Sequence, residues 1–209
     1  IGQEFVSVGV ISALNDADVV SATYRGHAAY IAKEGDLRKM MAELYGKAGG
    51  SAGGKAGSMH LVDMDRNILG TSAVVATTIP VAVGYALALK REGRGRVVAS
   101  FFGDGATEEG AFTECLNIAS LHDLPVLFVC ENNGYAIHSP IADRWASEAL
   151  CERVETYGIP AHRITDGDVF ALRSLSADAA KSMRAGGGPV FIECLACRWS
   201  EHVGPGEDF

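Results

Sequence analysis

Residues 96–137 read RVVASFFGDGATEEGAFTECLNIASLHDLPVLFVCENNGYAI, and this stretch decides the fold. The two apolar runs at 96–102 and 125–130 lack the polar alternation of a half-exposed strand, which is typical of strands covered by helices on both faces. Residues 109–121, between these runs, carry apolar side chains at helical spacing. A strand, a helix and a second strand in this order predict a βαβ crossover in a parallel sheet.

The same alternation continues on either side of this stretch. Further strands are predicted at 18–23, 161–164 and 189–195, and helices at 1–14, 37–45, 78–90, 147–157 and 168–184. Residues 46–57 are rich in glycine and are interpreted as a flexible loop. The predicted fold class is therefore α/β, with a central parallel sheet flanked by helices on both faces, in a single domain over residues 1–209.

Composition excludes several classes of protein. The net charge of −8 argues against a general nucleic-acid binder and against a polybasic membrane binder. No stretch predicts a membrane span, and no signal peptide is visible at the start, which also lacks an initiator Met. The five cysteines have no framework spacing, so we expect reduced thiols and a cytoplasmic protein. Cys194 and Cys197 form a lone C-x-x-C; residues three apart along a strand face opposite sides and there is no second pair, so no metal site is expected from them.

Polar groups follow four of the predicted strands. They occur at 24–27 (YRGH), at 103–110 (GDGATEEG), at 131–135 (ENNGY) and, after the last strand, at Arg198 and His202. Ligands of open parallel sheets bind at the carboxyl ends of the strands, so these groups are expected to surround one site.

The GDG and NN segments have a chemical interpretation together. Gly103 and Gly105 would let the backbone approach a phosphate at the start of a helix. Asp104 beside a phosphate is unfavourable unless a cation lies between them, and Mg²⁺ held by Asp104 and the amide oxygen of Asn133 would satisfy both groups. The alternative is that Asp104 caps a helix and that Asn132 and Asn133 form an ordinary turn.

Residues 103–137 resemble the thiamine-diphosphate motif, in which GDG is followed some thirty residues later by NN. Nearly the whole chain resembles the α subunits of the E1 component of 2-oxo acid dehydrogenase complexes, of the pyruvate, branched-chain and acetoin types. Four further segments carry this resemblance: TYRGHA (23–28), GKAGGSAGGKAGSMH (46–60), IPVAVGYALALK (79–90) and RWSEHVGP (198–205). The resemblance implies the thiamine-diphosphate-binding fold.

The same resemblance implies a set of ligands. Mg²⁺ would be bound by Asp104, by the side chain of Asn133 and by the main-chain oxygen of Tyr135. The cofactor would be bound by residues from all four strand ends and from the loop before the helix at 78–90: Tyr24 and Arg25 at the diphosphate, Gly103, Asp104, Gly105 and Ala106 in the phosphate loop, Val75 near the aminopyrimidine, and Asn133, Tyr135 and His202.

The resemblance also makes His202 the catalytic histidine, a role that suits proton transfer near neutral pH. His27 is a second catalytic candidate beside the phosphates. His60 and His138 are weaker candidates, and His122 and His162 are interpreted as surface residues.

The implied activity is decarboxylation of a 2-oxo acid, with transfer of the acyl unit to a lipoyl group of an E2 partner. The cofactor would be the electron sink and the protein would position it. A separate β subunit would supply the glutamate that activates the aminopyrimidine, so we expect a site shared within an α₂β₂ assembly. Glu108 and Glu109 are interpreted as acids at a helix N-terminus. A small, pyruvate-like acid is the preferred substrate.

The chain departs from the family pattern in three ways. Val203 stands where mitochondrial members have a regulatory serine after the histidine, Cys197 replaces a tyrosine, and the terminal segments of the family are expected to be absent. Two alternatives stay open: a transketolase-like or acyloin-forming enzyme that passes the enamine to an aldehyde, and a non-catalytic subunit that binds the cofactor for assembly. A nicotinamide-dinucleotide protein is disfavoured because no G-x-G-x-x-G motif follows a first strand.

Overall fold

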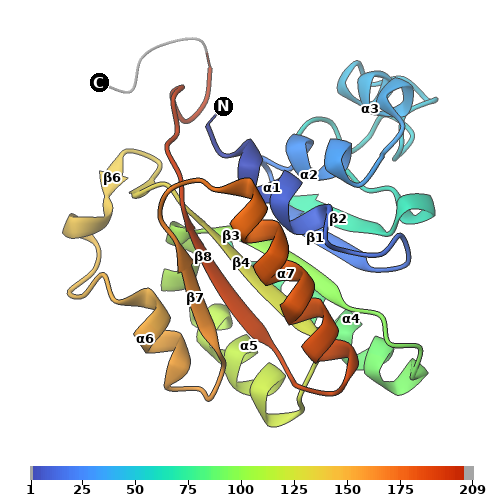
Figure 1. The fold of residues 1–209 in the computed structure, drawn as a ribbon. Coiled ribbons are helices and arrows are strands. Elements are labelled where there is room, and N and C mark those ends of the chain that lie inside the picture. Colours follow the sequence, from blue (N-terminus) through green and yellow to red (C-terminus); the bar gives the residue numbers. More distant parts are fainter. Residues whose placement is uncertain (1, 205–209) are drawn as a thin grey trace.

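The structure is a computed structural model that describes residues 2–204, and its centre is a six-stranded sheet in the order β2-β1-β3-β4-β8-β7 (Figure 1). All five strand pairs in this sheet are parallel, which confirms the predicted sheet. The strands are β1 (Val19–Thr23), β2 (Ile68–Ser72), β3 (Val98–Gly103), β4 (Val126–Asn132), β7 (Ala161–Ile164) and β8 (Val190–Leu195).

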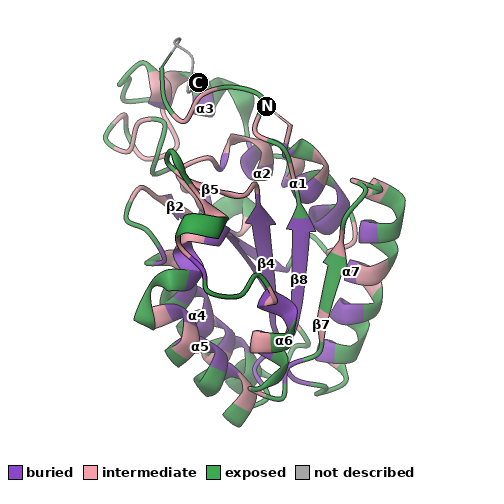
Figure 2. Cartoon of the chain, turned by 90° about the vertical axis from the view of Figure 1, so that its left-hand side faces the viewer, coloured by how far each residue is buried: buried purple, intermediate pink, exposed green. Residues whose placement is uncertain are grey.

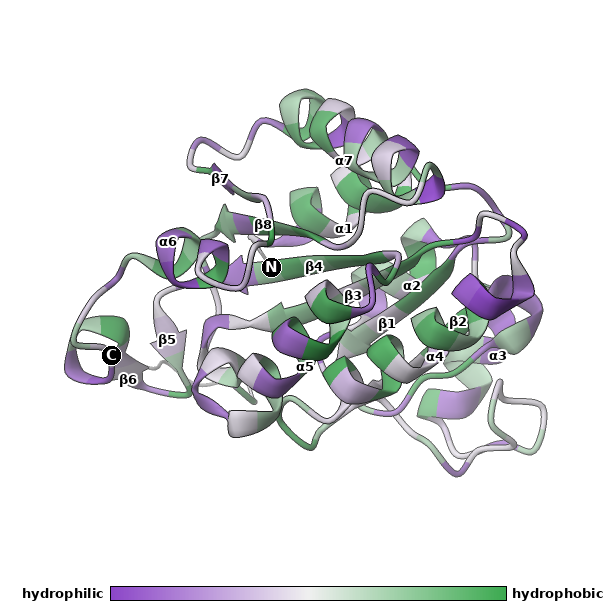
Figure 3. Ribbon diagram, turned by 90° about the horizontal axis from the view of Figure 1, so that it is seen from below, coloured by the Kyte–Doolittle hydropathy of each residue, from purple (hydrophilic) through white to green (hydrophobic). Residues whose placement is uncertain are grey.

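Helices cover both faces of the sheet, as predicted. One face packs against α1 (Glu4–Ile11), α2 (His27–Ala32) and α7 (Val169–Arg184), and the other against α4 (Thr78–Glu92), α5 (Gly110–Leu121) and α6 (Leu150–Glu155). Figure 3 shows these layers, with α7 and α1 on one side of the strands and α4 and α5 on the other. The remaining elements are α3 (Leu37–Leu44), the 3₁₀ turns η1 (Met64–Arg66), η2 (Asp104–Glu108) and η3 (Ile141–Asp143), and an antiparallel pair, β5 (Tyr135–Ala136) with β6 (Ser139–Pro140).

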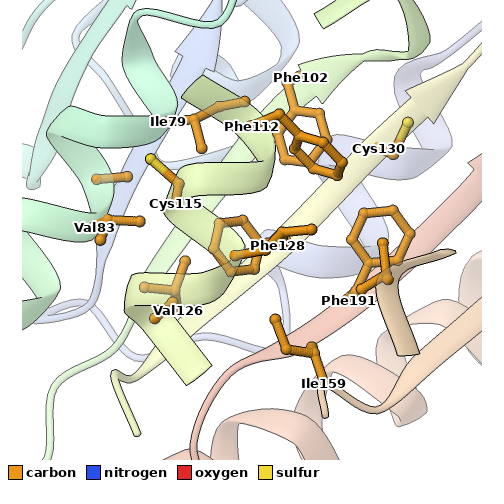
Figure 4. Close-up of a cluster of buried hydrophobic side chains, with 14 of the residues drawn as sticks. Ile79, Val83, Phe102, Phe112, Cys115, Val126, Phe128, Cys130, Ile159 and Phe191 are labelled. Atoms are coloured by element: carbon orange, nitrogen blue, oxygen red, sulfur yellow. The ribbon is translucent and has the colours of Figure 1, made fainter. Parts of the chain in front are cut away.

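Aromatic rings form the centre of the core beneath the site. Phe102 of β3 lies 5.5 Å from Phe112, 6.4 Å from Phe128 and 6.3 Å from Phe191, measured between ring centroids (Figure 4). All four side chains are buried. Figure 2 shows β4 buried along its whole length, whereas β7 at the sheet edge is largely exposed. The rigid part of the fold therefore supports the ends of β3 and β4, where the GDG and NN segments begin.

Several local predictions were incomplete. The sequence patterns missed α2, β2 and the β5–β6 pair, and the helices expected at 1–14 and 147–157 are shorter. Residue 1 lies outside the described part. The apolar stripe predicted for residues 37–45 faces solvent in part, because Leu37, Met41 and Tyr45 are exposed. No described helix is long and apolar enough to cross a membrane.

Candidate functional site

The carboxyl ends of β1, β3, β4 and β8 lie at the same edge of the sheet. The register pairs Gly103 of β3 with Glu131 of β4, and Glu131 with Cys194 of β8, so the loops that follow these strands are neighbours. A cavity of about 310 Å³ opens at this edge. Its lining includes all ten residues expected at the cofactor: Tyr24, Arg25, Val75, Gly103, Asp104, Gly105, Ala106, Asn133, Tyr135 and His202.

Asp104 begins η2 directly after β3, and its side chain is only 1% exposed. Desolvation raises the pKa of this carboxyl group, and the Arg144 guanidinium, which forms an ion pair with its Oδ2 atom, reduces that rise. The net shift is upward, so burial outweighs Arg144 and the hydrogen bonds from the backbone N–H groups of Asp104 and Asn133. A further positive charge at this carboxylate would therefore stabilise its ionised form.

The NN segment forms two consecutive Asx turns at the end of β4. Asn132 Oδ1 accepts a hydrogen bond from Gly134 N at 3.0 Å, and Asn133 Oδ1 accepts one from Tyr135 N at 3.0 Å. Gly134 has a φ of +79°, a left-handed conformation that glycine adopts without strain. The Asn133 side chain also donates from Nδ2 to Gln3 Oε1 at 2.9 Å, and Asn133 and Asp104 line the same cavity.

The donor set at this point fits a hard cation. A buried carboxylate, an amide oxygen and the main chain of Tyr135 line one cavity, and oxygen ligands of these kinds are those that Mg²⁺ prefers. Within residues 2–204 no group of three His, Cys, Asp or Glu side chains could hold a metal ion. The residues that line the cavity therefore suit a site with one carboxylate that leaves positions for water and phosphate oxygens.

The other side of the cavity is cationic. The Arg25 guanidinium lies 5.3 Å from the centroid of the Tyr24 ring, and its Nη1 donates to the carbonyl oxygen of His202 at 3.3 Å. The close packing of the phosphate loop explains Gly105, since a Cβ there would lie 2.9 Å from Cβ of Ala136. An arginine fork facing a glycine-containing turn is an arrangement that binds a diphosphate.

His202 lies at the centre of this cationic side. Its Nδ1 is 3.1 Å from Arg198 Nη1 and 3.4 Å from Arg25 Nη2, and its ring centroid is 5.8 Å from that of Tyr24 and 6.4 Å from that of His138. Guanidinium groups only donate hydrogen bonds, so Nδ1 accepts and the ring proton belongs on Nε2.

The other histidines separate into two groups. His27 lines an adjoining cavity of about 610 Å³, which His202 also lines, and its Nε2 lies 2.9 Å from Ser58 Oγ. His138 is exposed but close to His202, whereas His60 is exposed and lines neither cavity. His122 and His162 are exposed, as predicted.

Sequence reasoning missed three residues that line or support the site, Gln3, Arg144 and Glu193, and gave no role to Glu131 and Arg198, which it had placed among the polar groups at the strand ends. Glu131 lines both cavities at 9% exposure, and desolvation raises its pKa to about 7. Glu108 is more than an acid at a helix start, because it forms an ion pair with Arg144. Glu131 directly precedes the NN pair and was open to consideration from its position; Arg144 and Glu193 carry no local signal.

The glycine-rich loop binds a carboxylate of its own chain. Backbone N–H groups of Ala52 and Gly54 donate to Glu43 Oε2, and those of Ala56 and Gly57 donate to Oε1, at 2.6–3.1 Å. Desolvation raises the pKa of Glu43, but these four hydrogen bonds outweigh it and the net shift is downward. The loop expected to be flexible is therefore closed around a buried side chain.

Comparison with solved structures defines the class of the fold. A transketolase from Leishmania mexicana superposes with a TM-score of 0.65 at 18% identity, over 91% of this chain and 29% of that one. An enzyme from Mycobacterium smegmatis described as thiamin diphosphate-dependent superposes with a TM-score of 0.59 at 17% identity, over 91% of this chain and 31% of its own. The chain thus has the fold of thiamine-diphosphate-dependent enzymes.

Sequence comparison defines the family. The dehydrogenase E1 component family matches residues 1–207, and the chain belongs to it. The α subunit of acetoin:2,6-dichlorophenolindophenol oxidoreductase from Cupriavidus necator is 40% identical over 201 residues, which are 96% of this chain and 60% of that protein. The α subunit of the pyruvate dehydrogenase E1 component from Porphyra purpurea is 41% identical over 208 residues, with the same coverage of 96% and 60%. The chain spans about three fifths of the length of these relatives.

Proposed function

We propose that this chain carries the diphosphate and metal half of the active site in the α subunit of a thiamine-diphosphate-dependent E1 dehydrogenase. The enzyme would decarboxylate a small 2-oxo acid and transfer the acyl unit to a lipoyl group of an E2 partner. One observation carries the proposal: the ends of β1, β3, β4 and β8, together with the loop between β2 and α4, bring all ten expected cofactor residues to one cavity. Family membership and relatives with E1 α-subunit names support it.

Asp104, the Asn133 side chain and the main-chain oxygen of Tyr135 would hold Mg²⁺, whose charge would offset those of the Asp104 carboxylate and the diphosphate. Arg25 and Tyr24 would bind the diphosphate from the other side, assisted by the backbone of Gly105 and Ala106. Val75 would lie near the aminopyrimidine. Thiamine diphosphate, when bound, supplies the nucleophilic carbon and the electron sink for decarboxylation.

The proton chemistry of this half-site would belong to His202. Because Arg25 and Arg198 face its Nδ1, the neutral ring would present Nε2–H as a donor. His27 would be the second proton-transfer candidate, oriented by Ser58.

The remaining parts of the proposal concern partners. A β subunit would complete the site with the activating glutamate in an α₂β₂ assembly, as the likeness to E1 α subunits implies. No nucleic acid and no membrane take part in it. A cytoplasmic location stays a prediction from the sequence, as does the single domain over 1–209. The acyloin-forming alternative gains no specific observation, since the likeness to transketolase concerns the fold alone.

The test measures cofactor binding and turnover separately. The full-length α subunit is co-expressed with its β subunit, and thiamine diphosphate is titrated by calorimetry with Mg²⁺ and then with EDTA. We expect saturable binding that needs Mg²⁺ and is lost in Asp104→Ala but kept in Asp178→Ala, a change at an exposed aspartate on α7. Turnover of pyruvate, with 2,6-dichlorophenolindophenol as electron acceptor, then tests the substrate class. Absence of binding in the metal-loaded complex would refute the proposal, and binding without turnover of any 2-oxo acid would favour the non-catalytic alternative.

A further inference from the structure

The chain that follows the NN turn folds back onto the end of β3. Strands β5 and β6 form a short hairpin. The backbone N–H group of Ile141 donates to the carbonyl oxygen of Gly134 at 2.8 Å, which holds the hairpin against the NN turn. Ala136 of this hairpin packs against Gly105 of the phosphate loop. The segment then continues through η3 to Arg144. A single stretch thus starts at one proposed metal ligand, Asn133, and returns to the other, Asp104.

Arg144 makes the contact that completes this return, and its guanidinium uses all three nitrogens. Nε donates to Ser139 O at 3.1 Å, Nη1 pairs with the Glu108 carboxylate, and Nη2 pairs with Asp104 Oδ2. The Arg144 side chain is only 9% exposed. A planar fork held at each nitrogen has one orientation, so it also fixes the orientation of the carboxylate that it binds.

Glu108 balances the charge of this arginine. It pairs with Arg144 through Oε1, and the same oxygen accepts a hydrogen bond from Trp145 Nε1 at 3.0 Å. The Trp145 ring lies under the Arg153 guanidinium at 5.2 Å. Arg144 and Glu108 therefore form a neutral unit, and the negative charge of Asp104 stays available to a cation in the cavity.

We propose that Arg144 is a positioning residue for the metal carboxylate: it holds Oδ2 of Asp104 so that Oδ1 is presented to the metal, and it joins the two strand ends that carry the ligands. The proposal rests on the proposed function, because it requires that Asp104 binds Mg²⁺. Mg²⁺ demands near-octahedral geometry and would need only one oxygen of this carboxylate, so a second oxygen held by Arg144 is compatible with coordination. Groups that orient a metal ligand in this way are typically worth 10–100-fold in metal affinity.

A competing role for Arg144 predicts the opposite change in metal affinity. If Arg144 were a substitute cation that the metal must displace, its removal would strengthen metal binding. The geometry favours positioning, because Ser139 and Glu108 would hold the guanidinium in place even without its bond to Asp104. The direction of the change in affinity therefore separates the two.

The experiment compares metal affinity in the α/β complex, with Mn²⁺ as the probe, measured by electron paramagnetic resonance at saturating thiamine diphosphate. We expect Arg144→Gln to weaken Mn²⁺ binding 10–100-fold, and Arg144→Lys, which keeps the charge but loses the fork, to weaken it several-fold. Arg173→Gln changes an exposed arginine on α7 and serves as the matched control, with no change expected.

Glu108→Gln, measured in the same Mn²⁺ titrations, tests whether Glu108 neutralises the charge of Arg144. An unbalanced guanidinium beside the site would repel the metal, so we expect weaker Mn²⁺ binding than in the wild type. Unchanged or tighter binding in both Arg144 variants would overturn the proposal. Failure of the wild type itself to bind Mn²⁺ would refute the proposed function instead, so the two failures are distinguishable. Calorimetric unfolding of each variant complex identifies a folding defect, and Arg144→Lys carries the test if Arg144→Gln does not assemble.

Discussion

Glu193 of β8 offers the sharpest prediction, because one buried carboxylate holds three groups behind the site. Its Oε1 accepts a hydrogen bond from Asn132 Nδ2 at 2.7 Å, and its Oε2 accepts one from Arg163 Nε at 2.7 Å and one from Cys151 Sγ at 3.4 Å. The carboxylate is 1% exposed, whereas Arg163 is 36% exposed. The substitution Glu193→Gln keeps the shape, removes the charge and turns an amide N–H group toward at least one of these donors.

The magnitude follows from those contacts. A hydrogen bond to a charged group contributes about 1.5–3 kcal/mol, and the two short ones here cannot both be kept by an amide. Solvent partly screens the contact with Arg163, so we expect a loss of about 3 kcal/mol in the free energy of unfolding rather than the sum of both. For a chain of this size that corresponds to a fall in Tm of roughly 6–12 °C. Loss of the Asn132 contact should also loosen the turn that carries Asn133 and weaken metal binding about 10-fold.

The assay is differential scanning calorimetry of the full-length protein at fixed concentration, with Mn²⁺ affinity measured in parallel. Glu155→Gln, at an exposed glutamate of α6, is the control and should change Tm by about 1–2 °C or less, the usual size for a surface substitution. If Glu193→Gln were no more destabilising than this control, the reasoning that the buried carboxylate supports the turn would be wrong. A large fall in Tm with unchanged metal affinity would separate stability from support of the site.

Three further predictions follow from the site and its surroundings. Burial raises the pKa of Glu131 from 4.5 to about 7, so the folded state binds the proton more tightly than the unfolded state does. The free energy of unfolding of the wild type should therefore fall as pH rises from about 4.5 to 7. Above pH 7 the free energy of unfolding of Glu131→Gln should exceed that of the wild type by up to about 3 kcal/mol, measured by urea unfolding at several pH values. Glu43→Gln should speed proteolytic cleavage within residues 46–57. In the wild type the same cleavage should accelerate only as pH falls through the lowered pKa of Glu43, well below neutrality. Equal cleavage rates in the variant and the wild type at neutral pH would contradict the role of the four N–H hydrogen bonds. Gly105→Ala should weaken cofactor binding in calorimetry, because its Cβ would lie 2.9 Å from Ala136, whereas Gly110→Ala, which has no atom within 4 Å of its added Cβ, should not.

The apolar runs of the sequence were sufficient to predict the sheet. Strands β3, β4 and β8 are covered on both faces, so nearly every side chain in them is apolar and the pattern is plain. Elements that depend less on burial were missed: α2 has only six residues, and β2 (ILGTS) is interrupted by glycine and half exposed. In both, tertiary contacts rather than local preference stabilise the element.

The sequence by itself determined the position of the site. Parallel strands end at one edge, so groups that follow each strand meet there, and Asp104 and Asn133 needed no knowledge of side-chain contacts to be placed together. Nine of the ten predicted cofactor residues line one cavity for this reason, and the tenth, Val75, follows β2, a strand that the sequence patterns missed.

Only the tertiary structure decided what surrounds those residues. Arg144 on Asp104, Glu193 on Asn132 and Glu43 within the glycine-rich loop join side chains that are 40, 61 and 9–14 residues apart. Such pairs depend on strand order, on register and on the path of loops such as β5–β6, none of which has a periodic signature in the sequence. Each buried charge must nevertheless find a partner inside the fold, because burial without one costs several kcal/mol, and the structure shows which partner it is.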